Sequence, residues 1–433
     1  MNYMFSNTKL KTLDLTTFNT SNVEKINNMF YGCSLLETVN LSSFDTSNVN
    51  NMESMFYGCH NLLRIDLSNF NTSKVEKMNS MFRECHKLTS LDLTNFDTSK
   101  VKAFQNMFKE CRDIEYLDIS TFRTPEATNM SLMFYGMENI KYLDLRQFVT
   151  TKVTTMESMF YKCFNLEYLD LSSFETPLVQ KMNSMFRECY KLRYLNISNF
   201  TTPKVTAFQN MFKDAHSIEK LDLTKFDMSK AEDVGYMFFE CNSLNELTLG
   251  TFNIYKCSNL ESLFYNCKSL RTLDLSGFTT TGATKMNSMF SGCTTLEEIN
   301  LSSFNTSNVE EMQNMFRDCS SLIDLDVSSF NTIKVNTMSY MFGGCSSLRL
   351  LDLSNFNTRT TTNMNGMFHN DQSLVTIYVG DNFITSHISE APGMFVNNYA
   401  LVGGNGTRYN SENTGLTYAR VDSSTTPGYF TKK

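Results

Sequence analysis

The sequence predicts an α/β repeat solenoid, with parallel strands on one face, short helices on the other and about fifteen repeats of 26 residues. A Phe recurs every 26 residues from Phe30 to Phe368, each time after Met or Leu. A triplet of apolar, polar and apolar residues keeps the same step, from residues 13–15 to residues 377–379. Because no insertion interrupts this period, each repeat is expected to stack on the next and share its core.

The repeats are expected to form one array over residues 1–379. Beyond Val379 the repeated phrase weakens, although Phe383 and the "GMF" at 393–395 still resemble a repeat with one extra residue. We therefore expect residues 380–433 to form a C-terminal cap that covers the last coil.

Each repeat is expected to contain one short strand. Leu10, Leu13 and Leu15 follow the L-x-x-L-x-L spacing, which matches the strand of a leucine-rich repeat. Alternation in a half-buried strand would turn these three side chains to the core, and Thr12 and Asp14 to solvent.

A short helix is expected after the strand. Val23, Ile26, Met29 and Phe30 have spacings that place them on one face of a helix. Thr20 precedes this set, and its hydroxyl could cap the free N–H groups of the first turn. Glycines suited to ending a helix follow in several repeats, at Gly32, Gly58, Gly292 and Gly344.

Eleven of the twelve cysteines share one position of the repeat, from Cys33 to Cys345. Met137 and Ala215 take the same position in two repeats, so Cys exchanges there with apolar residues. We expect a ladder of buried free thiols. Disulfides and metal ligation are the alternatives, but there is no C-x-x-C pair and a 26-residue step does not match metal-site spacing.

The 27 methionines fall mostly before the recurring Phe and are expected in the core. His60 and His86 follow Cys in adjacent repeats. They are interpreted as exposed turn residues, with a Cys/His metal site as the alternative.

The composition argues against several functional classes. The net charge is −7 and basic residues are scattered, so no nucleic-acid partner is expected. No apolar run reaches the roughly 20 residues of a membrane span. No Ser-His-Asp, Cys-His or paired-carboxylate arrangement stands apart from the repeat. We therefore expect a protein that is not an enzyme, with no cofactor and no metal.

The outward face of the sheet is the candidate functional surface. The centre of the triplet is Asp in ten repeats, among them Asp118, Asp144 and Asp170. Ser or Thr stands two residues later in nine of the ten, and Arg146 in the other. This pattern indicates a solvated Asp ladder hydrogen-bonded by hydroxyl neighbours, or an acidic strip that binds cations or a basic partner.

A second outward position carries Tyr in four consecutive repeats, at Tyr116, Tyr142, Tyr168 and Tyr194. Exposed tyrosines offer a large contact area at low entropy cost and are enriched at binding hot spots. Arg146 and Arg193 are among the charges that would form a polar rim. The alternative is that the tyrosines only stabilise the sheet through cross-strand pairs.

The stretch "MFYGCHNLLRIDLSNFNTSKVEKMNSMF" resembles the BspA-like leucine-rich repeat, also described as a mycoplasma-lipoprotein-type repeat. The resemblance covers residues 1 to about 379. It implies a surface-exposed or secreted protein of host-associated bacteria, mycoplasmas or some protists, with a role in adhesion. The family has no conserved catalytic residues to carry over.

These observations predict a non-enzymatic binding module, a cell-surface adhesin segment that binds host matrix or cell-surface macromolecules through the strand face. Its partner would be a protein or glycan on a host or neighbouring cell. The alternative is a structural protein of a surface layer, filament or virion that self-associates through an uncapped N-terminal end. Because the chain shows no export signal, we expect a fragment of a longer exported protein located at the cell surface or secreted.

Overall fold

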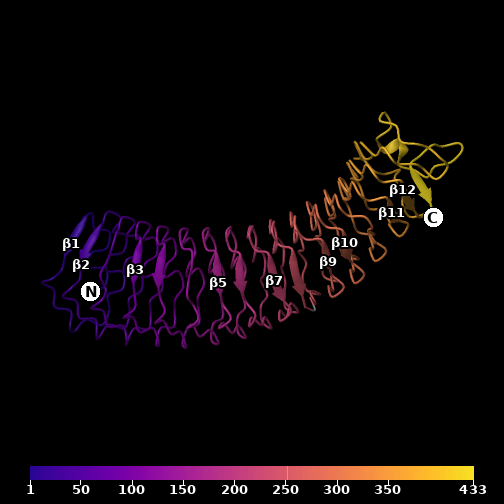
Figure 1. Cartoon of the computed structure of the whole chain (residues 1–433). Coiled ribbons are helices and arrows are strands. Elements are labelled where there is room, and N and C mark those ends of the chain that lie inside the picture. Colours follow the sequence, from indigo (N-terminus) through magenta and orange to yellow (C-terminus); the bar gives the residue numbers. More distant parts are fainter. Residues whose placement is uncertain (251) are drawn as a thin grey trace. The chain divides into compact units, whose positions relative to one another are not determined.

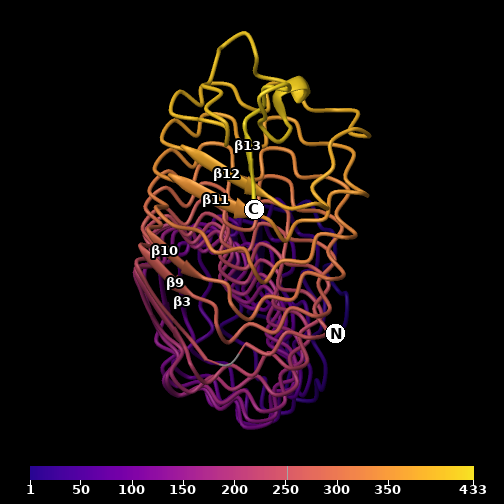
Figure 2. The same cartoon turned by 90° about the vertical axis from the view of Figure 1, so that its right-hand side faces the viewer.

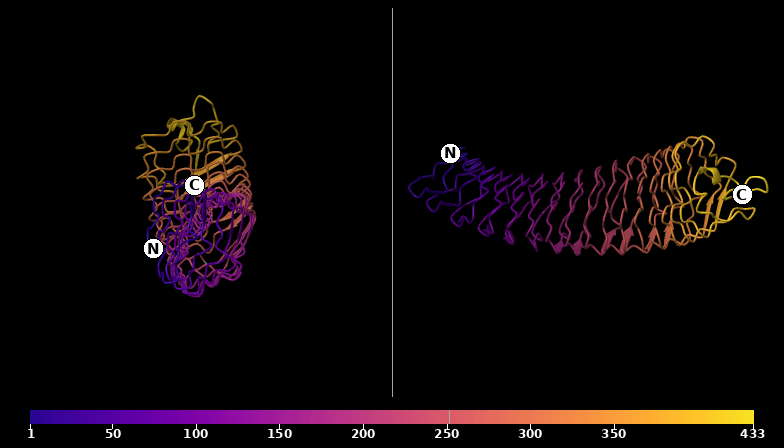
Figure 3. Two further views of the ribbon diagram at one scale, coloured as in Figure 1. Left: turned by 90° about the vertical axis from the view of Figure 1, so that its left-hand side faces the viewer. Right: turned by 90° about the horizontal axis from the view of Figure 1, so that it is seen from above.

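The chain folds as a parallel β-solenoid of about 14 turns, seen in a computed structural model that describes residues 1–250 and 252–433 (Figure 1). It divides into two compact units. Unit 1 is Met1–Val205 with Met211–Phe226, and unit 2 is Thr206–Asn210 with Asp227–Lys433. Within each unit, successive coils stack on one another, as two further views show (Figure 3). The predicted solenoid with parallel strands is therefore confirmed.

The strands are short because each coil contributes only three or four residues to the sheet. Unit 1 contains β1 (Thr12–Asp14), β2 (Thr38–Asn40), β3 (Ser90–Asp92), β4 (Tyr116–Asp118), β5 (Tyr168–Asp170), β6 (Tyr194–Asn196) and β7 (Lys220–Leu223). Unit 2 contains β8 (Glu246–Leu249), β9 (Thr272–Asp274), β10 (Glu298–Asn300), β11 (Leu350–Leu353), β12 (Thr376–Val379) and β13 (Phe430–Lys432).

Parallel pairing holds equivalent residues of neighbouring coils side by side. Strand β1 pairs with β2, β3 with β4 and β5 with β6 in unit 1. In unit 2, β9 pairs with β10, and β11, β12 and β13 form one sheet on the strand side (Figure 2). Three predicted triplets, at residues 65–67, 143–145 and 325–327, lie outside the regular strands.

The prediction of short helices on the opposite face is wrong. Over the described residues the one helical segment is the 3₁₀ turn η1 (Leu416–Tyr418). Asn28 and Gly32 have positive φ values of 57° and 70°, which reverse the chain every four residues. The N–H of Phe30 donates to the carbonyl of Met55 in the next coil, at 2.9 Å. A helix as short as the one predicted has little stability of its own. Hydrogen bonds between stacked coils instead give every second main-chain N–H group a partner.

The recurring Thr has a different role from the helix cap that was expected. The hydroxyl of Thr98 donates to the carbonyl of Arg123, at 2.7 Å, and accepts from the N–H of the same residue, at 2.9 Å. Thr20 bonds in the same way to Asp45. These hydroxyls therefore join one coil to the next, and both Thr side chains are buried.

The core consists of ladders of identical side chains. In unit 1, Phe30 stacks on Phe56 with ring centroids 5.3 Å apart, and Phe56 stacks on Phe82 at 5.8 Å. The expected Met positions, such as Met29 and Met55, are fully buried beside them. A residue of fixed shape repeated at the coil spacing can pack against its own copy, which explains why the repeat conserves size as well as polarity.

Candidate functional site

The four tyrosines predicted as a binding surface lie together on the strand face of unit 1, and we call them the tyrosine strip. Their exposed fractions are 64% for Tyr116, 47% for Tyr142, 40% for Tyr168 and 45% for Tyr194. Tyr168 and Tyr194 lie opposite each other in the pairing of β5 with β6, and Tyr142 is bridged to Tyr168. The alternation of the strands turns these side chains outward.

The rings of the tyrosine strip are not equally spaced. Tyr168 and Tyr194 stack with centroids 4.3 Å apart and an interplanar angle of 3°. Tyr142 is tilted by 34° relative to Tyr168, at 6.1 Å. Loss of solvent around the ring, followed by its hydrogen bond with Tyr194, raises the pKa of Tyr168. Tyr168 and Tyr194 therefore expose their ring edges and hydroxyl groups. Tyr116 has the most exposed ring of the four.

The Asp ladder is held mainly by main-chain hydrogen bonds. Oδ1 of Asp118 accepts from the N–H of Ser120 at 3.0 Å and from its hydroxyl at 2.7 Å. Oδ1 of Asp170 accepts from the N–H of Ser172 at 3.0 Å. The Ser neighbours predicted from the sequence are present. Their main-chain N–H donates to the Asp in both pairs, whereas the hydroxyl donates only in the pair of Asp118 and Ser120. A side-chain oxygen is all that this turn requires, which explains why Asn replaces Asp in some repeats.

One carboxylate of the ladder is neutralised within its own coil. Arg146 donates from Nε and from one terminal nitrogen to the two oxygens of Asp144, at 2.9 and 2.7 Å. The hydrogen bonds from Arg146 hold the pKa of Asp144 below its usual value. Arg193, the other predicted rim residue, is exposed directly before Tyr194. The strip thus has carboxylates, an internal ion pair and a cation around it.

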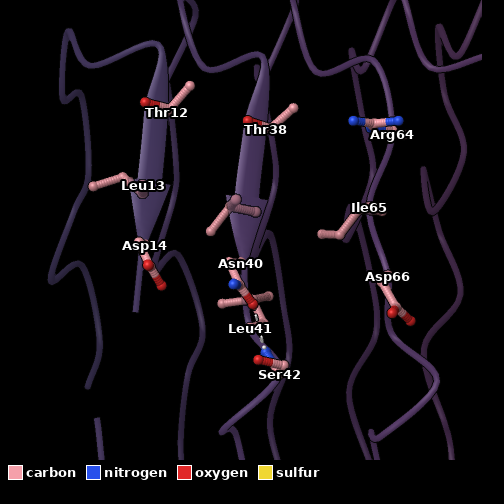
Figure 4. Close-up of a pocket in the computed structure, with 11 residues that line it drawn as sticks. Thr12, Leu13, Asp14, Thr38, Asn40, Leu41, Ser42, Arg64, Ile65 and Asp66 are labelled. Carbon is pink, nitrogen blue, oxygen red and sulfur yellow. Dashed lines mark hydrogen bonds between the residues drawn. The ribbon is translucent and has the colours of Figure 1, made fainter. Parts of the chain in front are cut away.

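A second feature of the strand face, a hollow, was not predicted from the sequence, although two of its lining residues, Arg64 and Asp66, are outward positions that the sequence leaves free to carry function. A hollow of about 540 Å³ lies over the first three coils of unit 1, and we call it the strand-face hollow (Figure 4). Its polar lining comes from Thr12, Asp14, Thr38, Asn40, Ser42, Arg64 and Asp66. The sequence does mark this place. Asn40 stands where most repeats have Asp, and in the next repeat Arg64 stands where other repeats have Thr or Tyr.

The hollow lies where two successive coils carry Thr at the outward position that Tyr fills elsewhere. Thr12 and Thr38 are opposite each other in β1 and β2. The equivalent position of later coils holds Tyr142 and Tyr168, where the remaining space is only about 110 Å³. The hollow and the tyrosine strip therefore occur at the same position of the repeat, which holds Thr in the first case and Tyr in the second.

The cysteine ladder is part of the core. All twelve cysteines are buried and none is in a disulfide, and the eleven that share the ladder position lie in the core as expected. Burial raises the pKa of Cys257, the one cysteine outside the ladder, to about 11, so this thiol stays protonated at neutral pH. His60 and His86 stack at 4.6 Å. Within residues 1–250 and 252–433, no three His, Cys, Asp or Glu side chains are grouped as metal ligands would be.

None of the helical structure in the described part of the chain has the length and apolar character that crossing a bilayer requires.

The family model described as "Mycoplasma protein of unknown function, DUF285" matches overlapping segments of the chain, at residues 1–115, 84–168, 154–276, 234–349 and 258–380. The chain belongs to this family. The resemblance to BspA-like leucine-rich repeats is confirmed by the DUF285 matches. None of the curated proteins compared with this chain matches it.

Solved leucine-rich-repeat structures share a general likeness with the DUF285 chain. A leucine-rich repeat protein from Bacteroides ovatus is 16% identical, with 75% of this chain and 80% of that chain covered and a TM-score of 0.44. A leucine-rich cell surface protein from Faecalibacterium prausnitzii is 14% identical, with 86% and 88% covered and a TM-score of 0.38. At these identities and TM-scores the likeness carries no information about ligands or partners.

Proposed function

We propose that this chain is a non-enzymatic binding module, a segment of a cell-surface or secreted adhesin, and that its tyrosine strip docks a macromolecular partner. The observation that carries the proposal is the exposure of four neighbouring tyrosines, between 40% and 64% each, on one sheet face. Large apolar side chains exposed in a contiguous row are uncommon on surfaces that bind nothing.

The chemistry of the strip favours a protein partner. Tyrosine has few rotatable bonds, so fixing it at an interface costs little entropy, and its hydroxyl can still bond at the rim. The stack of Tyr168 on Tyr194 restricts both rings before any partner arrives. Preorganised contacts of this kind increase affinity because less freedom is lost on binding.

The charges around the strip add selectivity. Asp118 and Asp170 each have Oδ1 engaged by the following residues, whereas Asp144 is paired with Arg146. A partner would therefore contact the carboxylates of Asp118 and Asp170, with the ion pair of Asp144 and Arg146 between them. With a net charge of −7, a nucleic-acid partner stays unfavoured in this proposal.

A Ser replacement at all four tyrosines tests the proposal. Ser90 occupies the same outward position and lies opposite Tyr116 in the pairing of β3 with β4, so Ser is compatible with the strand. We expect the quadruple variant to retain its circular dichroism spectrum and melting temperature within a few degrees. Its binding to immobilised extracellular-matrix proteins and to intact host cells should fall to background.

The opposite face offers a matched control with the same four substitutions. Tyr31, Tyr57, Tyr135 and Tyr161 share one position of the turn face, where another repeat has Ser291. Changing these four to Ser should leave binding intact. Equal binding by the strip variant and the native chain, or equal loss in both variants, would reject the strip as the docking site.

We also infer that residues 380–433 act as the cap of the array. Strand β13 pairs with β12, so Phe430 lies opposite Ile377. The Phe430 ring contacts Phe395 at 5.8 Å, and Tyr429 is fully buried. These contacts support a role in covering the apolar end of the last coils, because an uncovered solenoid end exposes its core.

A further inference from the structure

The strand-face hollow, which lies apart from the tyrosine strip, has an ordered set of hydrogen-bonding groups. Figure 4 shows Asp14, Asn40 and Asp66 at matching positions of three successive coils. Oδ1 of each accepts from the main-chain N–H two residues later, at 3.1, 3.1 and 3.0 Å. Each side chain therefore keeps a second polar atom for the hollow: a carboxylate oxygen, an amide NH₂ and another carboxylate oxygen.

A second row lies two residues earlier along each coil, about 6.6 Å away at strand spacing. It consists of the hydroxyls of Thr12 and Thr38 and the guanidinium of Arg64. Arg146 folds onto the carboxylate of its own coil, whereas the structure shows no ion pair for Arg64 among the described residues. The Arg64 donors therefore stay available to a ligand.

The floor of the hollow is apolar. Leu13, Val39 and Ile65 line it beneath the polar rows. Val39 is buried, whereas Leu13 and Ile65 are half-buried and keep part of their surface exposed. The hollow thus combines alternating donors and acceptors with an aliphatic surface, within the size range of small-molecule sites.

The charges restrict the class of ligand. Asp14 and Asp66 contribute two negative charges and Arg64 one positive charge, so an anionic ligand is repelled overall and a cationic one meets Arg64. The N–H of Ser68 keeps the pKa of Asp66 below its usual value, so this carboxylate is ionised at neutral pH. A ligand with many hydroxyls and no charge satisfies donors and acceptors alike.

We propose that the strand-face hollow binds neutral sugar units of a glycan. The three coils span about 10 Å at the usual strand spacing, which accommodates two linked pyranose rings. Ring hydroxyls would bond to the two polar rows, and the C–H face of a ring would rest on Leu13 and Ile65. This site is separate from the tyrosine strip and does not depend on the protein-docking function proposed for it.

Unit 2 contains a smaller hollow that serves as an internal comparison. It measures about 230 Å³ and is lined by the equivalent positions of two coils, Thr272, Leu273, Asp274, Glu298, Ile299 and Asn300. It has the same Asp–Asn pair, but Glu298 adds a carboxylate and no Arg is present. We expect no sugar binding there, because the site is small and lacks cationic donors.

Saturation-transfer NMR on the full chain with maltose, lactose and cellobiose tests the proposal. At least one of the three should receive saturation at millimolar concentration. Asn40→Asp keeps the turn oxygen and introduces the commonest residue of that position, yet removes the amide donor, so it should weaken binding about tenfold. Thr38→Tyr should abolish binding by filling the hollow with a side chain that later coils carry at the same position, as at Tyr116.

The matching changes in unit 2, Asn300→Asp and Thr272→Tyr, should leave the saturation signal unchanged. Circular dichroism of all four variants checks that the fold is retained. Three results would overturn the proposal: no saturation of any neutral disaccharide, a signal unaffected by Asn40→Asp and Thr38→Tyr, or saturation of N-acetylneuraminic acid alone, which would indicate an anion site at Arg64.

Discussion

The thiol of Cys111 lies 3.0 Å from the carbonyl oxygen of Phe82 in the preceding coil, and it donates its hydrogen to that oxygen. The same carbonyl also accepts from the N–H of Cys85 at 3.1 Å. The repeated Cys is therefore a buried donor that links coils, in addition to filling space. Ala215 shows that the position tolerates losing this bond, because the carbonyl keeps its main-chain donor.

Replacing Cys111 with Ala should lower the free energy of unfolding by roughly 1–2 kcal/mol, from a lost weak hydrogen bond and a small cavity. Urea denaturation followed by circular dichroism measures the change. The same replacement at Cys33, which has an equivalent bond at the first coil, provides a second measurement. An unchanged urea midpoint for Cys111→Ala would contradict a stabilising role for the thiol.

Thr98→Val should be more destabilising than Cys111→Ala. Valine keeps the shape of the side chain but leaves both the N–H and the carbonyl of Arg123 without the hydroxyl partner they have in the native chain. We expect a loss of roughly 1–3 kcal/mol in the free energy of unfolding, by urea titration. Thr121→Val is the control, because the Thr121 hydroxyl makes only a 3.5 Å contact with Leu93. Equal effects of the two substitutions would contradict this role of Thr98.

Asp371 should make stability depend on pH. It occupies the cysteine position after Cys345, is fully buried, and neither carboxylate oxygen has a hydrogen-bond partner. Burial raises its pKa well above 3.8, and the nearby main-chain N–H groups of Cys345 and Gly344, which favour the charged form, offset only part of this rise. The charge of Asp318 adds to the increase. Because the folded pKa exceeds the unfolded one, the favourable contribution is complete below about pH 4 and is lost as pH rises towards the folded pKa.

Urea midpoints of the native chain and of Asp371→Cys, measured from pH 4 to pH 8, check this dependence. The variant restores the usual ladder residue, so its advantage over the native chain should grow as pH rises across this range. Asp318→Asn, which changes a neighbouring charge but leaves the buried group, should retain most of the dependence. Parallel curves for the native chain and Asp371→Cys would show that Asp371 does not titrate with folding.

Calcium should leave the melting temperature unchanged, although the Asp ladder is acidic. Calcium requires six to eight oxygen ligands, and each Asp of the ladder already commits Oδ1 to a main-chain N–H. Differential scanning fluorimetry with and without millimolar calcium measures this, with magnesium as the control. A rise in melting temperature specific to calcium would favour the cation-binding alternative for the ladder.

Removal of residues 380–433 should cause aggregation, because β12 would lose its partner β13 and Phe368 would lose its contact with Phe430. Dynamic light scattering at matched concentrations measures the particle size. Lys432→Ala with Lys433→Ala is the control, since it removes surface charges and keeps the strand. A monodisperse truncated chain would contradict the role of these residues as a cap.

Most buried positions of the repeat could be predicted from the sequence, although Leu10, which was expected in the core, is 53% exposed. The local structure predicted for half of the repeat was wrong. Ile26, Met29 and Phe30 are buried as predicted, yet they lie in stacked turns. Their spacing fits a helix and a series of turns equally well. Residue type did not reveal this backbone either. Asn28 and Gly32 suit a positive φ, but equivalent positions of other coils adopt positive φ with Ser54, Leu132 and Glu84.

The sequence by itself determined the 26-residue period, the solenoid and the residues that face outward, including the tyrosine strip. These features follow from the pattern of apolar and polar residues along the chain, which can be recognised without knowing how neighbouring coils contact each other. The bonds of Thr98 and Cys111 to neighbouring coils, and the hollow that Thr12 and Thr38 leave beside Arg64, became visible only in the folded chain. Such features arise between coils, so they depend on how close the next copy lies and which atoms it presents.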